Sequence, residues 1–213
     1  SCSSNVLRRG GSIQIRHGKY CCAFAPVSTT PVKTLPFGTT IDGRPASLYV
    51  LRNDRGTEAH LTDFGATLVA MKVKGKDGTF ADVVLGFDTE AGYEGSHPYF
   101  GALIGRYCNR IAGGRFSIGN TEYVLGCNRG VHHLHGGFRG FDKVRWRVRM
   151  QNQCLRLAYV SADGEDGYPG ELTVAVDYAL GDDDALRIDY RATTTRSTPA
   201  NLTSHPYFNL AGH

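Results

Sequence analysis

Apolar and polar residues alternate with a period of two along the second half of the chain. Between residues 144 and 150, apolar side chains at the even positions alternate with arginines at the odd ones. Because successive side chains of a strand point to opposite faces, this pattern predicts a strand with one apolar face. The apolar positions are Val144, Trp146, Val148, Met150; Leu155, Leu157, Tyr159; Leu172, Val174, Val176, Tyr178; Leu186, Ile188, Tyr190. Four such segments joined by short turns predict an antiparallel sheet packed on a core.

The first half of the chain contains shorter apolar segments separated by turn residues. Lys76-Asp77-Gly78 and Gly119-Asn120 are typical of β-hairpins, and the 27 glycines indicate many turns. No alternation of strands with helices is visible. The predicted strands cover residues 46–51, 58–61, 67–74, 82–87, 115–118 and 121–125. We therefore expect an all-β protein, built as an antiparallel β-sandwich or barrel.

The N-terminal segment differs in composition from the rest of the chain. Residues 1–36 hold five basic residues, no acidic residue and no clear periodicity. This composition is typical of a transit peptide, and fits translated non-coding or foreign sequence nearly as well. We expect residues 1–36 to be an unstructured, targeting or non-native segment, and residues 37–213 to form the domain. Since the chain begins with serine and its first methionine is Met71, we also expect it not to begin at a natural start.

Charge and cysteine usage exclude several classes of protein. Residues 37–213 hold 19 basic and 20 acidic residues, so the net charge of +4 comes from the N-terminal segment and predicts no nucleic-acid partner. No segment approaches the roughly 18 apolar residues of a membrane span. The six cysteines lack the spacing of a zinc knuckle, and a reducing compartment is the default.

Histidines offer the most informative chemistry. His132, His133 and His135 lie together before Gly136-Gly137, and His205 follows in a second polar and aromatic stretch. On an extended backbone His133 and His135 would share one face and His132 would take the other. Two histidines can act as acid and base, bind a metal, or serve as structural hydrogen-bonding groups. A metal site built on the His133-x-His135 pair lacks the nearby carboxylate of a facial triad, so we expect no metal. No GxSxG element is present for a serine hydrolase, and the acidic loop at residues 163–170 is too short for an EF-hand.

Four motifs resemble those of the aldose 1-epimerase (galactose mutarotase) family, in the order and at separations compatible with that family. They are GRYCNRIAGGRF, LHGG followed by GFDKVRW, DGEDGYPGEL, and NLTSHPYFNLAG. The resemblance covers residues 37–213 and implies a large antiparallel β-sandwich. It also implies an enzyme that interconverts the α and β anomers of free hexoses such as glucose and galactose, by acid–base ring opening without metal or organic cofactor.

The resemblance assigns roles to particular residues. His205 matches the general acid, and His135 matches the histidine that holds and polarises the ring oxygen. Asn109 and Arg110 match sugar-binding residues, and Tyr207 flanks the acid. His132 and His133 have no firm family role, so we expect them to be structural.

The family's general base is a glutamate near the C-terminus of its domain, and no glutamate of this chain matches its motif. We therefore expect a domain truncated at its C-terminus and impaired in catalysis. The alternative is a non-catalytic carbohydrate-binding β-sandwich. A cytoplasmic location is expected, or a plastid location if residues 1–36 are a transit peptide. The sequence does not fix the preferred sugar or the oligomeric state.

Overall fold

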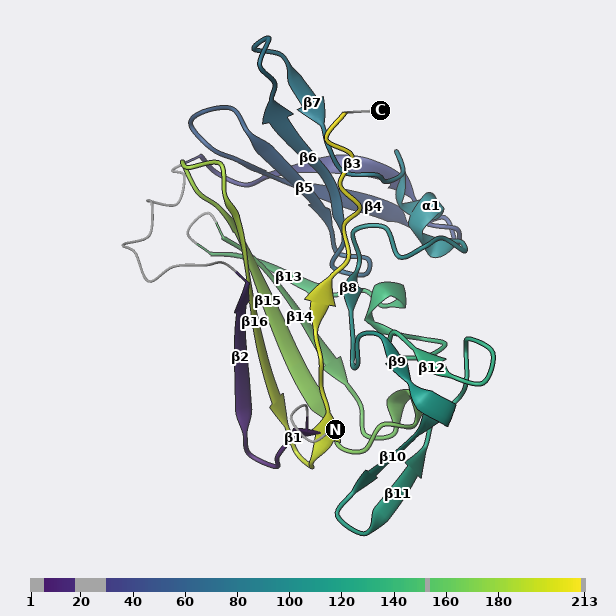
Figure 1. Cartoon of the computed structure of the whole chain (residues 1–213). Coiled ribbons are helices and arrows are strands. Elements are labelled where there is room, and N and C mark those ends of the chain that lie inside the picture. Colours follow the sequence, from purple (N-terminus) through teal and green to yellow (C-terminus); the bar gives the residue numbers. More distant parts are fainter. Residues whose placement is uncertain (1–5, 18–29, 152–153, 212–213) are drawn as a thin grey trace.

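Two antiparallel sheets, each of five strands, form the body of the protein (Figure 1). The computed structural model describes residues 6–17, 30–151 and 154–211. Apolar side chains of both sheets meet in one core cluster, to which Leu61 and Leu68 contribute from one sheet and Leu157 and Val176 from the other. This arrangement confirms the predicted all-β antiparallel sandwich.

The larger sheet has the strand order β13-β14-β15-β16-β2. Its strands are β13 (Arg147–Gln151), β14 (Cys154–Ser161), β15 (Leu172–Leu180), β16 (Leu186–Thr194) and β2 (Ser12–His17). Leu155, Leu157, Val174 and Val176 are fully buried, as the alternation predicts. The prediction is wrong for Met150, whose side chain is 55% exposed, because it lies near the end of the strand at the sheet's edge, beyond the core.

The second sheet has the order β3-β4-β5-β6-β7. Its strands are β3 (Lys33–Thr39), β4 (Pro45–Arg52), β5 (Glu58–Thr62), β6 (Leu68–Lys74) and β7 (Phe80–Asp82). The strand predicted over residues 82–87 is wrong, since β7 ends at Asp82 and Val84 makes only an isolated bridge to Phe208. The Asp82 carboxylate accepts the N–H groups of Met71 and Val84. Main-chain pairing continues beside it, since Val83 N–H donates to the Met71 carbonyl at 3.0 Å and Leu85 N–H donates to the Tyr207 carbonyl at 2.9 Å.

The described part of residues 1–36 forms strands, which corrects the expectation that this segment is unstructured. β1 (Val6–Leu7) pairs with β17 (Thr198–Pro199), and β2 pairs with β16 along the edge of the larger sheet. Leu7 is buried in the main core. The composition of residues 1–36 did not predict β1 and β2, because the strands with which they pair, β17 and β16, lie far along the chain. Residues 1–5 and 18–29 are outside the described residues, and a targeting role of the segment stays a prediction.

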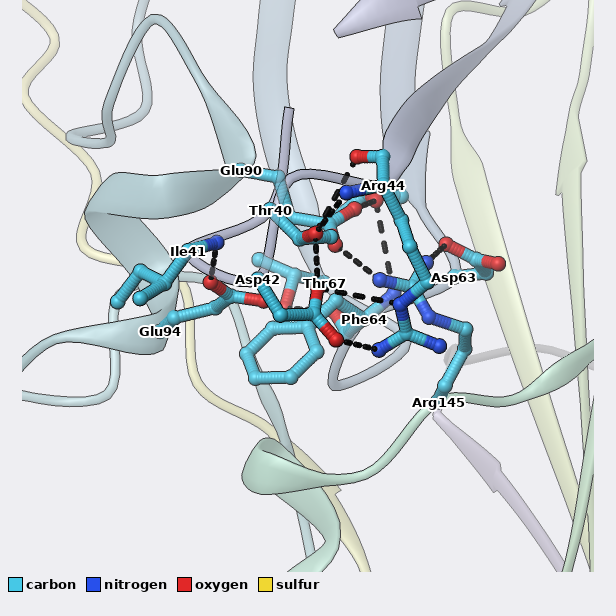
Figure 2. A network of polar contacts seen from close by, with 11 residues as sticks. Thr40, Ile41, Asp42, Arg44, Asp63, Phe64, Thr67, Glu90, Glu94 and Arg145 are labelled. Atoms are coloured by element: carbon cyan, nitrogen blue, oxygen red, sulfur yellow. Dashed lines mark hydrogen bonds and ion pairs between the residues drawn. The ribbon is translucent and has the colours of Figure 1, made fainter. Parts of the chain in front are cut away.

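An ion-pair network ties the two sheets together (Figure 2). Arg145, just before β13, donates to Asp63 at 2.7 Å and to Glu90. Asp63 follows β5, and Glu90 begins the short helix α1 (Glu90–Glu94). Thr62 donates a further hydrogen bond to Glu90 at 3.1 Å. Glu90 is fully buried, and burial raises its pKa. A buried carboxylate needs polar partners, and Arg145 and Thr62 supply them here.

Short strands and turns fill the side of the sandwich where the predicted site residues lie. β8 (Leu103–Ile104) pairs with β18 (Thr203–Ser204), and β9 (Arg110–Ile111) pairs with β12 (His133–Leu134). β10 (Arg115–Ile118) and β11 (Thr121–Val124) form the hairpin predicted around Gly119-Asn120. The 3₁₀ helices are η1 (Ala112–Gly114), η2 (Phe141–Lys143) and η3 (Glu165–Gly167). Among the helices of the described segments, none has the length and apolar character to cross a membrane.

Candidate active site

Two short ladders bring the predicted site residues together. His135 directly follows β12, and Arg110 begins β9, the partner of β12. His205 directly follows β18, whose partner β8 lies only a few residues before Asn109. Figure 1 shows these two ladders beside the larger sheet, with the C-terminal strand running alongside β8. The pairing of distant segments therefore places both histidines at one location.

His135 and Asn109 are joined by two hydrogen bonds. The His135 N–H donates to the Asn109 carbonyl at 3.2 Å, and the Asn109 N–H donates to His135 Nδ1 at 3.0 Å. Asn109 Oδ1 in turn accepts the N–H of Arg110 at 2.9 Å and its Nη1 at 3.4 Å. Asn109 and Arg110 are exposed beside the histidine, where amide and guanidinium groups are able to contact a polar ligand.

The rings of His135 and His205 meet edge to face. Their centroids are 5.3 Å apart, with an interplanar angle of 83°. Tyr207 also lies beside His205, with 5.2 Å between the centroids of the two rings. The structure thus gathers all five of the predicted site residues, and their chemical roles stay predictions.

The hydrogen bonding of His135 fixes which atom carries its proton. Burial, followed by the charges of His205 and Arg110, lowers the pKa of His135 to about 4, so the ring is neutral near pH 7. A neutral imidazole has one donor and one acceptor nitrogen. Since Nδ1 accepts the Asn109 N–H, the proton lies on Nε2, which is therefore a hydrogen-bond donor.

His133 and His132 both make hydrogen bonds within the protein. His133 is fully buried, its Nδ1–H donates to the Gly126 carbonyl at 2.7 Å, and Tyr168 donates to its Nε2 at 2.7 Å. His132 Nδ1 accepts the N–H of Gly113 at 3.2 Å. Both nitrogens of His133 are engaged, so the His133-x-His135 pair does not present two ligands to a metal. Within residues 6–17, 30–151 and 154–211, no group of three or more His, Cys, Asp or Glu is placed to hold a metal ion.

The extended conformation that we expected for His133 to His135 ends at Leu134. His135 has a φ of +53°, in the left-handed region. Its ring therefore does not follow the face of His133, as strand alternation would require. Gly136 continues the turn, and a Cβ there would collide with the carbonyl oxygen of Gly105. The glycines of LHGG thus permit the main chain to approach the Gly105 carbonyl closely at the turn where the strand ends.

The acidic loop at residues 163–170 supports the turn behind His135. The Asp166 carboxylate accepts the N–H of Phe138 at 3.0 Å and that of Arg139 at 3.2 Å. Tyr168, in the same loop, holds His133. Sequence reasoning excluded an EF-hand in this loop and found a family motif there, but assigned none of its residues a contact with the histidine turn.

Sequence reasoning also missed Tyr99. Its ring packs edge to face on His135, with centroids 4.7 Å apart, and lies 6.0 Å from the ring of His205. An isolated tyrosine in a loop gives no periodic signal, so no pattern in the sequence pointed to it.

Comparison with known proteins assigns the family. The model of the aldose 1-epimerase family matches residues 47–213. The chain belongs to the aldose 1-epimerase family. It is 46% identical over 186 residues to galactose mutarotase of Rattus norvegicus, an alignment that covers 87% of this chain and 53% of the relative. It is 42% identical over 172 residues to aldose 1-epimerase of Escherichia coli K12, covering 80% of this chain and 50% of the relative.

Solved structures of the family show the same fold. A GalM/aldose epimerase homologue from C. elegans matches with a TM-score of 0.76 and 32% identity, over 79% of this chain and 52% of that one. Galactose 1-epimerase from Lactobacillus acidophilus matches with a TM-score of 0.72 and 27% identity, over 84% and 53%. The chain spans about half the length of the aldose 1-epimerases and galactose mutarotases that it matches.

Proposed function

We propose that this protein is an aldose 1-epimerase, which interconverts the α and β anomers of free hexoses. The observation that carries the proposal is the edge-to-face contact of His135 and His205, beside Asn109 and Arg110. Each of these residues lies in one of the motifs that resemble the family. The names of the relatives make galactose the first sugar to test, and glucose is the second hexose that the family resemblance implies.

In this proposal His205 is the general acid and donates a proton to the ring oxygen of the sugar. His135, neutral and protonated on Nε2, donates a hydrogen bond to the same oxygen and polarises it. Removal of the proton from the C1 hydroxyl then opens the ring to the aldehyde. Rotation about C1–C2 and reclosure give the other anomer.

The base that accepts the C1 hydroxyl proton is assigned to the glutamate that the family carries near the C-terminus of its domain. Carboxylates near His135 are engaged elsewhere. Asp166 accepts main-chain N–H groups, Glu165 accepts the hydroxyls of Tyr159 and Ser161, and Asp142 is buried. None of these three groups is therefore a substitute for that glutamate.

Asn109, Arg110 and Tyr207 are proposed to hold the sugar. Arg110 supplies N–H donors to hydroxyl oxygens, and Asn109 supplies a donor and an acceptor. An aromatic face such as that of Tyr207, which is 38% exposed, suits the C–H surface of a hexose. The proposal includes no cofactor, no nucleic-acid partner and no membrane partner. It places the protein in the cytoplasm, or in a plastid if residues 1–36 are a transit peptide.

The test follows the optical rotation of freshly dissolved α-D-galactose and α-D-glucose with a form of the protein that carries the family's C-terminal glutamate, and with variants of that form. His205→Ala should lose about 10²–10⁴-fold in rate while the sugar still binds, because the proton donor is gone. His135→Ala should lose both rate and affinity, because that residue touches the ring oxygen before and during ring opening. His132→Ala is the matched control, since its ring bonds only Gly113 in the structure.

Two outcomes overturn the proposal. A His205→Ala variant with near-normal turnover would remove His205 from the role of acid. A parent protein that binds galactose but does not speed the change in rotation would favour the alternative, a carbohydrate-binding β-sandwich without catalysis.

A further inference from the structure

The ring of Tyr99 lies close to the rings of both His135 and His205. Its ring meets His135 edge to face at 4.7 Å and 70°, and its centroid is 6.0 Å from that of His205. The two histidines are themselves 5.3 Å apart, so the three rings form one compact cluster. Tyr99 is half-buried, and burial raises the pKa of its hydroxyl, so it stays neutral beside the pair.

The turn that begins at Tyr99 also holds the main chain of His205. Ala102 N–H donates to the Tyr99 carbonyl at 3.2 Å, closing the turn. His205 N–H then donates to the Ala102 carbonyl at 2.9 Å, and Gly101 N–H donates to the His205 carbonyl at 3.1 Å. The same turn is anchored on the second sheet, where Leu68 N–H donates to the Gly101 carbonyl at 2.9 Å. Tyr99 thus contacts His135 with its ring and positions His205 through its turn.

The backbone of Tyr99 adopts a conformation that costs free energy. Its φ is +61°, in the left-handed region, which is strained for a residue other than glycine. Asn109 and His135 share this conformation, with φ values of +68° and +53°. Three such residues meet at one site, which is the pattern expected where a precise arrangement of side chains is held against local preference.

We propose that Tyr99 is a positioning residue of this site: its ring holds the imidazole of His135 perpendicular to that of His205 and keeps water from that side. The catalytic consequence rests on the proposed function, whereas the positioning itself does not. Burial is the main cause of the low pKa of His135, and the Tyr99 ring supplies part of that burial. Removing the ring therefore exposes His135 and frees it to turn.

The test compares three variants of the full-length protein by NMR titration of the His135 ring. Tyr99→Gly removes the ring and relieves the backbone, so thermal unfolding should stay close to that of the parent. The pKa of His135 should nevertheless rise by at least one unit toward its ordinary value of about 6.5. Tyr99→Leu retains the backbone cost and should shift the titration in the same direction. Tyr99→Phe should titrate like the parent, because its ring makes the same edge contact.

Turnover is measured on the same samples. The two variants without an aromatic ring should lose at least tenfold in kcat, with a smaller change in KM. The reason is that the histidines are misplaced, whereas the proposed contacts of Asn109, Arg110 and Tyr207 with the sugar remain. Tyr123→Leu is the matched control, since Tyr123 stacks on Phe116 in the β10–β11 hairpin. It should leave the His135 titration unchanged.

A His135 titration that is the same in Tyr99→Gly, Tyr99→Leu and the parent overturns the positioning role. If the Tyr99 variants shift the His135 titration but the parent protein has no mutarotase activity, the positioning role is upheld and the proposed function is overturned instead. A shifted titration with kcat unchanged would show that the position of His135 does not govern the rate, and would also overturn the catalytic part of the inference.

Discussion

Replacing Arg106 by methionine should strongly destabilise the protein. The Arg106 side chain is 2% exposed, and its guanidinium lies between the end of β14 and the loop that precedes β15. It donates to Ser161 Oγ (2.9 Å) and to the carbonyls of Ser161 (3.0 Å), Ala162 (2.6 Å), Pro169 (3.2 Å) and Gly170 (2.7 Å). Methionine fills a similar space without any donor.

The size of the effect follows from these acceptors. Four main-chain carbonyls lose a donor, and each buried acceptor left unpaired costs about 1–3 kcal/mol. Part of this loss is offset, because methionine avoids the cost of burying a charge, a cost that also lowers the pKa of Arg106. A net loss of about 3–5 kcal/mol in the free energy of unfolding is expected, because four unpaired carbonyls together cost more than this offset. Arg106→Lys should lose most of this, since a single ammonium cannot reach acceptors spread around a planar fork.

The assay is urea unfolding followed by tryptophan fluorescence. Trp146 is the single tryptophan of the chain, it is 2% exposed, and it donates to the Phe141 carbonyl at 3.2 Å, so its emission reports the core. Arg149→Met is the matched control, because Arg149 is exposed on β13, and it should change stability by less than about 0.5 kcal/mol. If Arg106→Met moves the urea midpoint no further than Arg149→Met does, the carbonyls do not depend on this guanidinium and the reasoning fails.

Three further predictions concern Asp142, Asp166 and metal dependence. Burial raises the pKa of Asp142 to about 6. Between about pH 4 and 6 this carboxyl group is therefore protonated in the folded protein and ionised in the unfolded chain. Asp142→Asn should therefore match the parent's stability below about pH 4 and exceed it by about 2–3 kcal/mol above pH 7. A difference in stability that does not widen with pH contradicts this. Asp166→Ala should lower the free energy of unfolding by about 1–2 kcal/mol and slow the change in optical rotation, because the Phe138 and Arg139 N–H groups lose their acceptor. Asp166→Asn keeps an acceptor and should cost less. Equal losses in the two variants would exclude the role of Asp166 as that acceptor. Dialysis against EDTA should leave the mutarotation rate unchanged, since the proposed chemistry transfers only protons; one transition metal per chain, with activity lost on its removal, would oppose it.

The sequence by itself determined the sheets that are built from local alternation and tight turns. The period-two segments became β13 to β16 in consecutive antiparallel order, with Leu157 opposite Val176 and Val176 opposite Tyr190. The Gly119-Asn120 turn produced the β10–β11 hairpin. These features were predictable because a strand's face and a two-residue turn depend on neighbouring residues alone. The family motifs likewise indicated which residues the site contains.

Only the tertiary structure decided how those residues meet. It placed β2 against β16, although nothing in the composition of residues 1–36 distinguished a strand. It also separated two histidines that the alternation had placed on one face, since His133 is locked between Gly126 and Tyr168 while His135 turns toward His205. Tyr99 joined the pair without any signal in the sequence. The physical reason is that periodicity reports which way a side chain points, whereas its partners come from segments far apart in the chain that meet only when the sheets pack.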